Sequence, residues 1–170
     1  NGDGIADLLI GTATFMNVHS NQGAVYAFSG AQLRAGGSFS HSNALWSLEG
    51  SHSNAQFGFS VAAADINHDG ISDIVIGAPF HSNSVAGRLG RVFVYFGSPN
   101  IHSNTQPNQV LIPELGIAGA HWFGFSVSAA SDVNHDGYTD VLVGAPRYSR
   151  TFANQGAAYL YYGSPTGLVL

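Results

Sequence analysis

Short apolar segments alternate along the chain with polar, glycine-rich segments. The apolar segments are rich in valine, isoleucine, phenylalanine and tyrosine, which are typical of β-strands. Helical periodicity is weak, and the 22 glycines argue against long helices. The pattern therefore predicts an all-β fold.

The pattern repeats with a period of 66 or 67 residues, which is the spacing of Asp3, Asp69 and Asp136. Three other elements return in the same order, and chance does not explain four matched elements. They are Phe-Gly-Phe-Ser-Val at 57–61 and 123–127, Gly-Ala-Pro at 77–79 and 144–146, and a glycine-bounded segment at 23–30, 90–97 and 156–163.

Each repeat predicts four short antiparallel strands, as in a blade of a β-propeller. In the second repeat the strands are expected at 57–64, 73–77, 91–96 and 109–115.

The chain then holds about two and two-thirds blades of a partial ring. Residues 1–50 form an incomplete first blade, 57–116 a complete blade, and 123–170 a nearly complete third. A partial ring leaves blade faces uncovered. We expect the missing blades to come from more of the parent chain or from other copies.

All eight aspartates lie in three copies of one loop, and the only other acids are Glu49 and Glu114. The complete copies carry Asp, Asn, Asp and Asp at positions 1, 3, 5 and 9, with a glycine at position 6 and a backbone carbonyl available at position 7. Such an oxygen-only set favours Ca²⁺. The candidate ligands are Asp65, Asn67, Asp69, Ile71 and Asp73 in the second loop, Asp132, Asn134, Asp136, Tyr138 and Asp140 in the third, and Asn1, Asp3, Ile5 and Asp7 in the truncated first copy.

Two other loop types fit less well. An EF-hand would need a glutamate at position 12, where Ile76 and Val143 stand, and both an EF-hand and a dockerin-like loop would need a helix where strands are predicted. An Asx-rich turn that binds nothing remains an alternative. With three carboxylates and no position-12 glutamate, we expect a dissociation constant of about 10⁻⁴ to 10⁻³ M and a structural role for the ion.

The composition of the chain argues against two classes of partner, nucleic acid and the membrane interior. Charged residues make up 9% of the chain, lysine is absent, and the net charge of −5 argues against nucleic acid as a partner. No apolar run reaches the roughly 18 residues of a membrane span, so we expect no membrane insertion. The chain begins inside the first loop, and we expect it to be a piece of a longer protein.

Phe57 and Gly58, the acidic loop, and Gly-Ala-Pro at 77–79 together resemble the FG-GAP repeat. The set that begins at Phe123 resembles it equally. This repeat forms the blades of the integrin α-subunit head, and also occurs in glycosylphosphatidylinositol-specific phospholipase D and in bacterial surface proteins. The resemblance implies a seven-bladed propeller with calcium in loops on one face. The first repeat departs from it, with no Phe-Gly and with Gly-Thr-Ala at 11–13.

Histidine occurs five times in the triplet His-Ser-Asn, between predicted strands. Successive connections alternate faces, so we expect His19, His52 and His81 opposite the acidic loops and His41 and His102 beside them. That scattering disfavours one shared Zn²⁺ site.

Position 4 of each complete loop is also histidine, His68 or His135, which we expect to be exposed. Trp46 and Trp122 are predicted to pack in the core or between blades, with sugar stacking as the alternative.

No catalytic constellation is evident, because the aspartates are committed to the loops and the two glutamates are isolated. We expect a non-enzymatic, calcium-stabilised, extracellular scaffold that binds another protein in cell adhesion. The resemblance favours contact on the face opposite the metal loops, at connections 12–22, 50–56 and 78–89. The alternatives are an accessory region of an enzyme such as the phospholipase, and a carbohydrate-binding propeller.

Overall fold

The computed structural model describes residues 1–36, 40–82, 88–101, 105–113 and 121–170. These residues form ten strands and two short helical segments, which confirms the all-β prediction. In chain order the elements are β1 (Leu8–Thr12), β2 (Ala24–Phe28), α1 (Gly30–Arg34), the 3₁₀ turn η1 (His41–Asn43), β3 (Trp46–Glu49), β4 (Ser60–Ala64), β5 (Asp73–Ala78), β6 (Arg91–Tyr95), β7 (Gln109–Leu111), β8 (Ser126–Ala129), β9 (Val141–Ala145) and β10 (Ala157–Tyr161).

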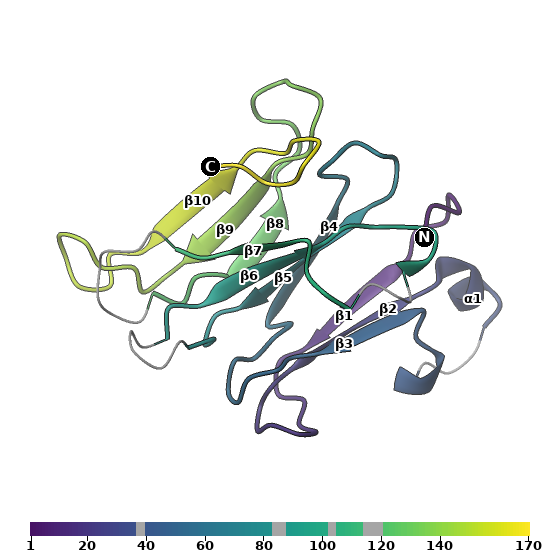
Figure 1. Ribbon diagram of the computed structural model, residues 1–170, viewed down its shortest axis with the longest axis horizontal. Coiled ribbons are helices and arrows are strands. Elements are labelled where there is room, and N and C mark those ends of the chain that lie inside the picture. The colour runs from purple at the N-terminus through teal and green to yellow at the C-terminus, as the bar shows by residue number, and fades with distance from the viewer. Residues whose placement is uncertain (37–39, 83–87, 102–104, 114–120) are drawn as a thin grey trace.

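The strands form three antiparallel sheets in which chain neighbours pair (Figure 1). The first sheet has the order β1-β2-β3, the second β4-β5-β6-β7, and the third β10-β9-β8. This is the expected arrangement of partial propeller blades: four strands in the middle sheet and three in each outer one.

Four strand boundaries differ from the prediction, two of them by one residue, since β5 ends at Ala78 and β6 ends at Tyr95. β4 begins at Ser60 instead of residue 57, and Phe57 forms an isolated parallel bridge to Gly23, the residue before β2. β7 ends at Leu111, shortly before Pro113, which has no N–H to donate to a ladder. The last residues of that predicted strand, 114 and 115, lie outside the described residues.

Two apolar clusters form the core, one between each pair of adjacent sheets. Trp46 of the first sheet is 3% exposed, and its ring centroid lies 5.5 Å from that of Tyr95 in the second, which confirms the prediction for this tryptophan. Phe123 and Val75 belong to the cluster between the second and third sheets. Every residue of β5 is buried, because the middle sheet has a neighbour on both faces.

Each Phe-Gly segment meets, across a sheet interface, the glycine that begins Gly-Thr-Ala at 11–13 or Gly-Ala-Pro at 77–79. Gly58 has φ of 82°, a conformation that favours glycine, and its carbonyl oxygen lies so close to Gly11 that a side chain there would collide with it. Gly124 meets Gly77 in the same way one interface further along the chain. The motif glycines therefore set how closely one sheet approaches the next.

The outer sheets each have one uncovered face. Leu8 and Ile10 of β1 are 41% and 37% exposed, whereas Ile74 and Ile76, at the equivalent positions of β5, are buried. In β9 it is Leu142, on the opposite face, that is 43% exposed. Strands β1, β5 and β9 carry similar apolar residues at equivalent positions. Their different exposure therefore comes from whether a neighbouring sheet covers each face.

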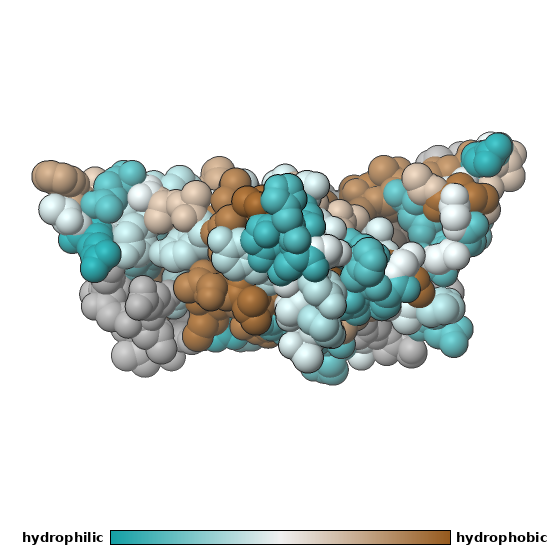
Figure 2. Space-filling model, turned by 90° about the horizontal axis from the view of Figure 1, so that it is seen from above, coloured by the Kyte–Doolittle hydropathy of each residue, from teal (hydrophilic) through white to brown (hydrophobic). Residues whose placement is uncertain are grey.

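The connections lie along two opposite edges of the sheets. The loops joining β4 to β5 and β8 to β9, which carry the acidic repeats, project at the top of Figure 1, and the β5–β6 and β9–β10 connections lie at the other ends of the strands. Figure 2 looks onto the edge with the acidic loops, where hydrophilic and hydrophobic groups alternate over the surface. We call the two sides the acidic-loop edge and the opposite edge.

Candidate metal centre

The first aspartate of each complete loop is held by the backbone of that loop. The two carboxylate oxygens of Asp65 accept hydrogen bonds from the N–H groups of Asp69 and Gly70, both at 3.0 Å. Asp132 accepts the equivalent bonds from Asp136 and Gly137 at 3.0 and 2.9 Å. The bond from the Gly137 N–H stabilises the charged carboxylate and lowers the pKa of Asp132.

The middle of the loop is held by its second acid, the aspartate at position 5. Asp69 accepts the Ile71 N–H at 2.8 Å and the Asn67 side-chain amide at 3.0 Å. His68 and Gly70 both have positive φ, at 59° and 85°, so the chain turns sharply at positions 4 and 6. The third loop repeats this geometry, and both position-4 histidines are exposed as predicted.

The aspartate at position 9 is buried and connects the loop to the rest of its sheet. Asp73 is 0% exposed and accepts the Ile66 N–H at 2.9 Å and the Gly97 N–H at 2.8 Å. Asp140 accepts from Val133 at 2.7 Å and from Gly163 at 3.0 Å. Each carboxylate therefore links its own loop to the residues that follow the third strand of the sheet.

These glycine partners were not predicted as part of the site. A Cβ on Gly97 would collide with the carbonyl oxygen of Ser72 at loop position 8, and Gly163 and Gly30 are packed against Thr139 and Ala6 in the same way. The glycine that closes the recurring segments at 23–30, 90–97 and 156–163 was the available sequence signal.

Burial, assisted by the charges of Asp69 and Asp65, raises the pKa of Asp73 to about 6, although its two backbone hydrogen bonds from Gly97 and Ile66 lower it. A buried carboxylate beside two others is costly to ionise. A bound cation would remove that cost, so the electrostatics of this loop fit a metal ion.

The first loop repeats the same turn from position 3 onward. Asn1 accepts the Asp3 N–H at 2.9 Å, Asp3 accepts the Ile5 N–H at 2.8 Å, and Asp7 accepts the Gly30 N–H at 2.9 Å.

The described parts of the chain contain no group of three acidic, histidine or cysteine side chains placed to hold a metal ion together. The aspartate oxygens bond instead to backbone N–H groups. A carboxylate oxygen has more than one lone pair, and each loop adds an amide and a carbonyl oxygen. The donor chemistry fits a hard cation, and the predicted ligand roles stay a prediction.

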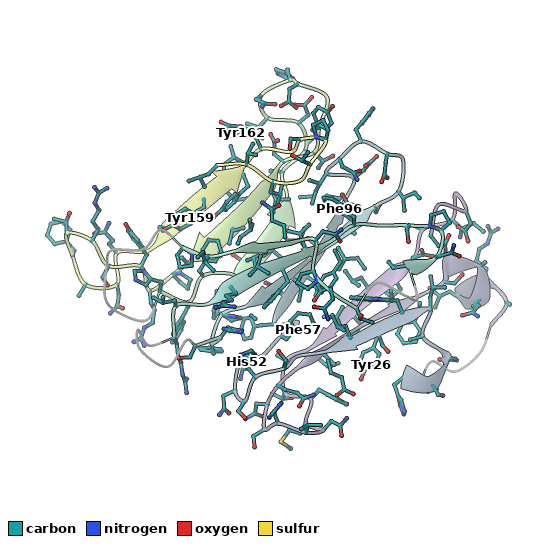
Figure 3. All side chains as sticks on the ribbon, in the orientation of Figure 1. Tyr26, His52, Phe57, Phe96, Tyr159 and Tyr162 are labelled. Carbon is teal, nitrogen blue, oxygen red and sulfur yellow. The ribbon has the colours of Figure 1, made fainter. Side chains whose placement is uncertain are left out.

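Three of the His-Ser-Asn segments, described at 19–21, 52–54 and 81–82, lie together at the opposite edge, as predicted. The rings of His52 and His81 are 4.2 Å apart, and the Asn54 N–H donates to the Ser20 carbonyl at 2.7 Å. Asn21 and Asn54 have positive φ, which asparagine tolerates better than most residues. Figure 3 shows His52 far from Tyr162, which lies near the acidic-loop edge.

The other two triplets begin at His41 and His102. His41 begins the 3₁₀ turn η1, in the connection between β2 and β3. His102 lies outside the described residues, so its predicted place is not tested.

Comparison with known proteins agrees with the repeats and the fold described above. The FG-GAP repeat family matches residues 57–95 and 123–161, the two segments that contain the complete loops. The chain carries FG-GAP repeats. It is homologous to integrin alpha subunits and to a phosphatidylinositol-glycan-specific phospholipase D.

Three relatives illustrate the range of this FG-GAP chain's similarities. Integrin alpha-3 of Cricetulus griseus is 32% identical over 89% of the chain and 13% of its own length. Integrin alpha-PS5 of Drosophila melanogaster is 37% identical over 66% of the chain and 10% of its own length. The Dictyostelium discoideum phospholipase D is 30% identical over 96% of the chain and 19% of its own length. The chain therefore spans less than a fifth of each relative.

Among the residues described, neither helical segment of this FG-GAP chain has the length and apolarity of a membrane span.

Proposed function

We propose that the chain is part of a calcium-stabilised, extracellular propeller that serves as a protein-binding scaffold in cell adhesion. The observation that carries the calcium assignment is the identical hydrogen-bond pattern of two loops 67 residues apart, each with a buried aspartate at position 9. Equal spacing of the acidic residues in sequence would not by itself give the two loops the same hydrogen bonds.

In this proposal each complete loop supplies three carboxylates, one amide oxygen and one backbone carbonyl. The ligands are Asp65, Asn67, Asp69, Ile71 and Asp73 in one loop and Asp132, Asn134, Asp136, Tyr138 and Asp140 in the other. Asn1, Asp3, Ile5 and Asp7 form a third set without position 1. The bound ion supplies positive charge and fixes the loop geometry.

The scaffold assignment is supported by the named integrin relatives and by the separation of the two edges. Calcium would bind at the acidic-loop edge, which leaves the connections 12–22, 50–56 and 78–89 at the opposite edge for a protein partner. The proposal gives the chain no catalytic role, because its aspartates are held in the loops. The phospholipase relative supports a second candidate, in which the same scaffold accompanies an enzyme domain.

Equilibrium dialysis with Ca²⁺ tests the metal assignment. We expect at least two bound equivalents, and Asp69→Asn or Asp136→Asn should each remove one. Glu49→Gln is the matched control, since it removes an acid that lies outside the loops. Unchanged stoichiometry in both aspartate variants would place calcium elsewhere on the chain.

The binding role is tested by the adhesion of cells to surfaces coated with the chain. Alanine substitutions in segments 12–22 and 50–56 should reduce adhesion more than substitutions at Val133 and His135, which are exposed at the acidic-loop edge and are not proposed calcium ligands. An equal effect from both edges would contradict the assignment of the partner surface.

A further inference from the structure

The second and third acidic loops lie against each other at the acidic-loop edge, from which both project (Figure 1). His68 is at position 4 of the second loop, and its ring centroid lies 6.1 Å from that of Tyr138, with 76° between the ring planes. The side chain of His68 is otherwise exposed. Tyr138 is at position 7 of the third loop, where the backbone carbonyl is a proposed calcium ligand. A ring of one loop therefore packs edge to face on a ligand residue of the next loop.

A second contact between these two loops runs through the backbone. Ile66, at position 2 of the second loop, is fully buried and belongs to the apolar cluster between the second and third sheets. Its carbonyl oxygen packs on Gly163, where a Cβ atom would lie only 2.8 Å from that oxygen and 2.7 Å from the Cβ of Tyr138. The close approach of the two loops therefore requires a glycine at this position.

Hydrogen bonds extend the backbone contact to the buried aspartates at position 9. The Ile66 N–H donates to Asp73 at 2.9 Å, and the Gly163 N–H donates to Asp140 at 3.0 Å. Both aspartates are proposed calcium ligands, each in its own loop. One continuous set of contacts therefore links the two proposed sites, from Asp73 through Ile66 and Gly163 to Asp140.

The first and second loops meet in the same way, but without the ring. Gly2 is at position 4 of the first loop, and a Cβ atom on it would lie 3.3 Å from the side chain of Ile71, at position 7 of the second loop. Packing of neighbouring sheets thus brings position 4 of one loop onto position 7 of the next at both interfaces. His135, at position 4 of the third loop, has no following sheet in the described part of the chain. His68 and His135 therefore differ in whether a neighbouring loop is within reach.

Order in one of the two loops makes the other easier to order. Once the second loop is fixed, His68 and Ile66 present a settled surface to Tyr138 and Gly163, so the third loop loses less conformational entropy when it closes around its own ion. Linkage requires the same effect in the reverse direction. Charge acts the other way, because an ion in one loop cancels negative charge that attracts an ion to the next. A gain in affinity can therefore be assigned to the contacts.

We propose that His68 is a positioning residue for the calcium site of the third loop. Its contact with Tyr138, supported by the backbone contact of Ile66, makes the second and third loops bind calcium cooperatively. The inference rests on the proposed calcium binding and adds the regulation of those sites. We expect each loop to bind calcium about threefold more tightly when the other is filled, which is at the low end of what an aromatic pair supplies because the ring of His68 is exposed.

The test follows the backbone amide signals of Gly70 and Gly137 by nuclear magnetic resonance as Ca²⁺ is added to the whole chain. Each glycine is at position 6 of its own loop and donates its N–H to the first aspartate of that loop, at 3.0 Å for Gly70 and 2.9 Å for Gly137. The two signals therefore report the two loops separately, even when binding is weak. Asp69→Asn removes a ligand of the second loop and should raise the midpoint of the Gly137 titration about threefold. Asp136→Asn should raise the Gly70 midpoint by the same factor.

His68→Asn isolates the contact, because it removes the ring, keeps every aspartate, and puts asparagine at a positive φ that it tolerates. It should raise the Gly137 midpoint about threefold. Combined with Asp136→Asn it should leave the Gly70 midpoint where Asp136→Asn alone puts it, which separates an effect on the next loop from damage to its own. His135→Asn is the matched control, since φ is 61° there, and both midpoints should stay as in the parent chain. Circular dichroism in EGTA checks that each variant is folded.

The same Gly137 midpoint in the parent chain, Asp69→Asn and His68→Asn would show two independent sites and overturn the proposal. Equal losses in His68→Asn and His135→Asn would also overturn it, because among the described residues no sheet follows the loop of His135. Failure of the proposed function looks different, since neither glycine signal would then respond to calcium in any of these proteins. Two responsive but independent loops would keep the proposed calcium binding and reject the coupling alone.

Discussion

The imidazole of His81 makes the stability of the chain depend on pH in a predictable direction. His81 is 4% exposed, and its Nδ1 has no hydrogen-bond partner. It lines a cavity of about 390 Å³ together with His52 and Glu49. Burial, followed by the charges of Arg91 and His52, lowers the pKa of His81 to about 4 from its ordinary value of 6.5.

The sign follows from which state binds the proton. Between pH 6.5 and about 4 the unfolded chain protonates this histidine and the folded chain does not, so His81 makes the fold less stable as pH falls through that window. At 1.36 kcal/mol per pKa unit the loss amounts to about 3 kcal/mol at most. The loss is absent above pH 6.5.

Asp73 acts in the opposite direction over nearly the same range. Its pKa is raised from 3.8 to about 6, so the folded chain binds the proton first as pH falls, and the fold gains stability between pH 6 and about 4. That gain is also about 3 kcal/mol at most. The two groups offset each other, and we expect the calcium-free chain to show little net pH dependence from these two groups.

The His81→Gln variant separates the two effects. Urea denaturation of calcium-free protein at pH 7 and pH 4.5 should show that the variant gains about 2–3 kcal/mol on the parent chain between the two values. His41→Gln is the control, since His41 is exposed, and it should follow the parent chain at both values. If His81→Gln and the parent changed in parallel, the imidazole would not be buried in its neutral form as argued.

Two further predictions address the packing. Gly97→Ala should destabilise the chain by more than about 2 kcal/mol, because the new methyl group collides with the Ser72 carbonyl, whereas Gly36→Ala, with open space around it but positive φ, should cost about 1 kcal/mol. Urea midpoints that rank the two glycine variants the other way would contradict that packing. Ile76→Ala should cost about 2–5 kcal/mol and Ile10→Ala under about 1 kcal/mol, although both hold the same place in the repeat, because Ile76 is 0% and Ile10 is 37% exposed. Equal losses in thermal unfolding would show that β1 is covered in solution.

Local sequence patterns were enough to predict much of this fold. Apolar runs bounded by glycine located the strands, and the 67-residue spacing of Asp69 and Asp136 marked equivalent loops. The alternation of connections also placed His52 and His81 at one edge, where their rings are 4.2 Å apart. These features depend on residues close in sequence or on the order of the strands.

Other features depend on partners distant in sequence and could not be predicted in this way. Asp73 is fixed partly by the Gly97 N–H, 24 residues away, which no loop motif contains. Trp122 packs between sheets, which is one of the two predicted alternatives, but its partner Phe80 of the neighbouring sheet could not be deduced from the local sequence. The exposure of Leu142 follows from the absence of a fourth sheet beside β9 in the described chain.

The central claim is that calcium stabilises this chain through the acidic loops, and the melting temperature in Ca²⁺ against EGTA tests it most directly. For a dissociation constant of about 10⁻³ M, 10 mM Ca²⁺ stabilises the fold by about 1.4 kcal/mol per site, or about 3 kcal/mol for two sites. For a chain of this size that corresponds to a rise of about 5–10 °C. We predict such a rise, halved in Asp69→Asn or Asp136→Asn. The same melting temperature in Ca²⁺ and in EGTA would contradict the account.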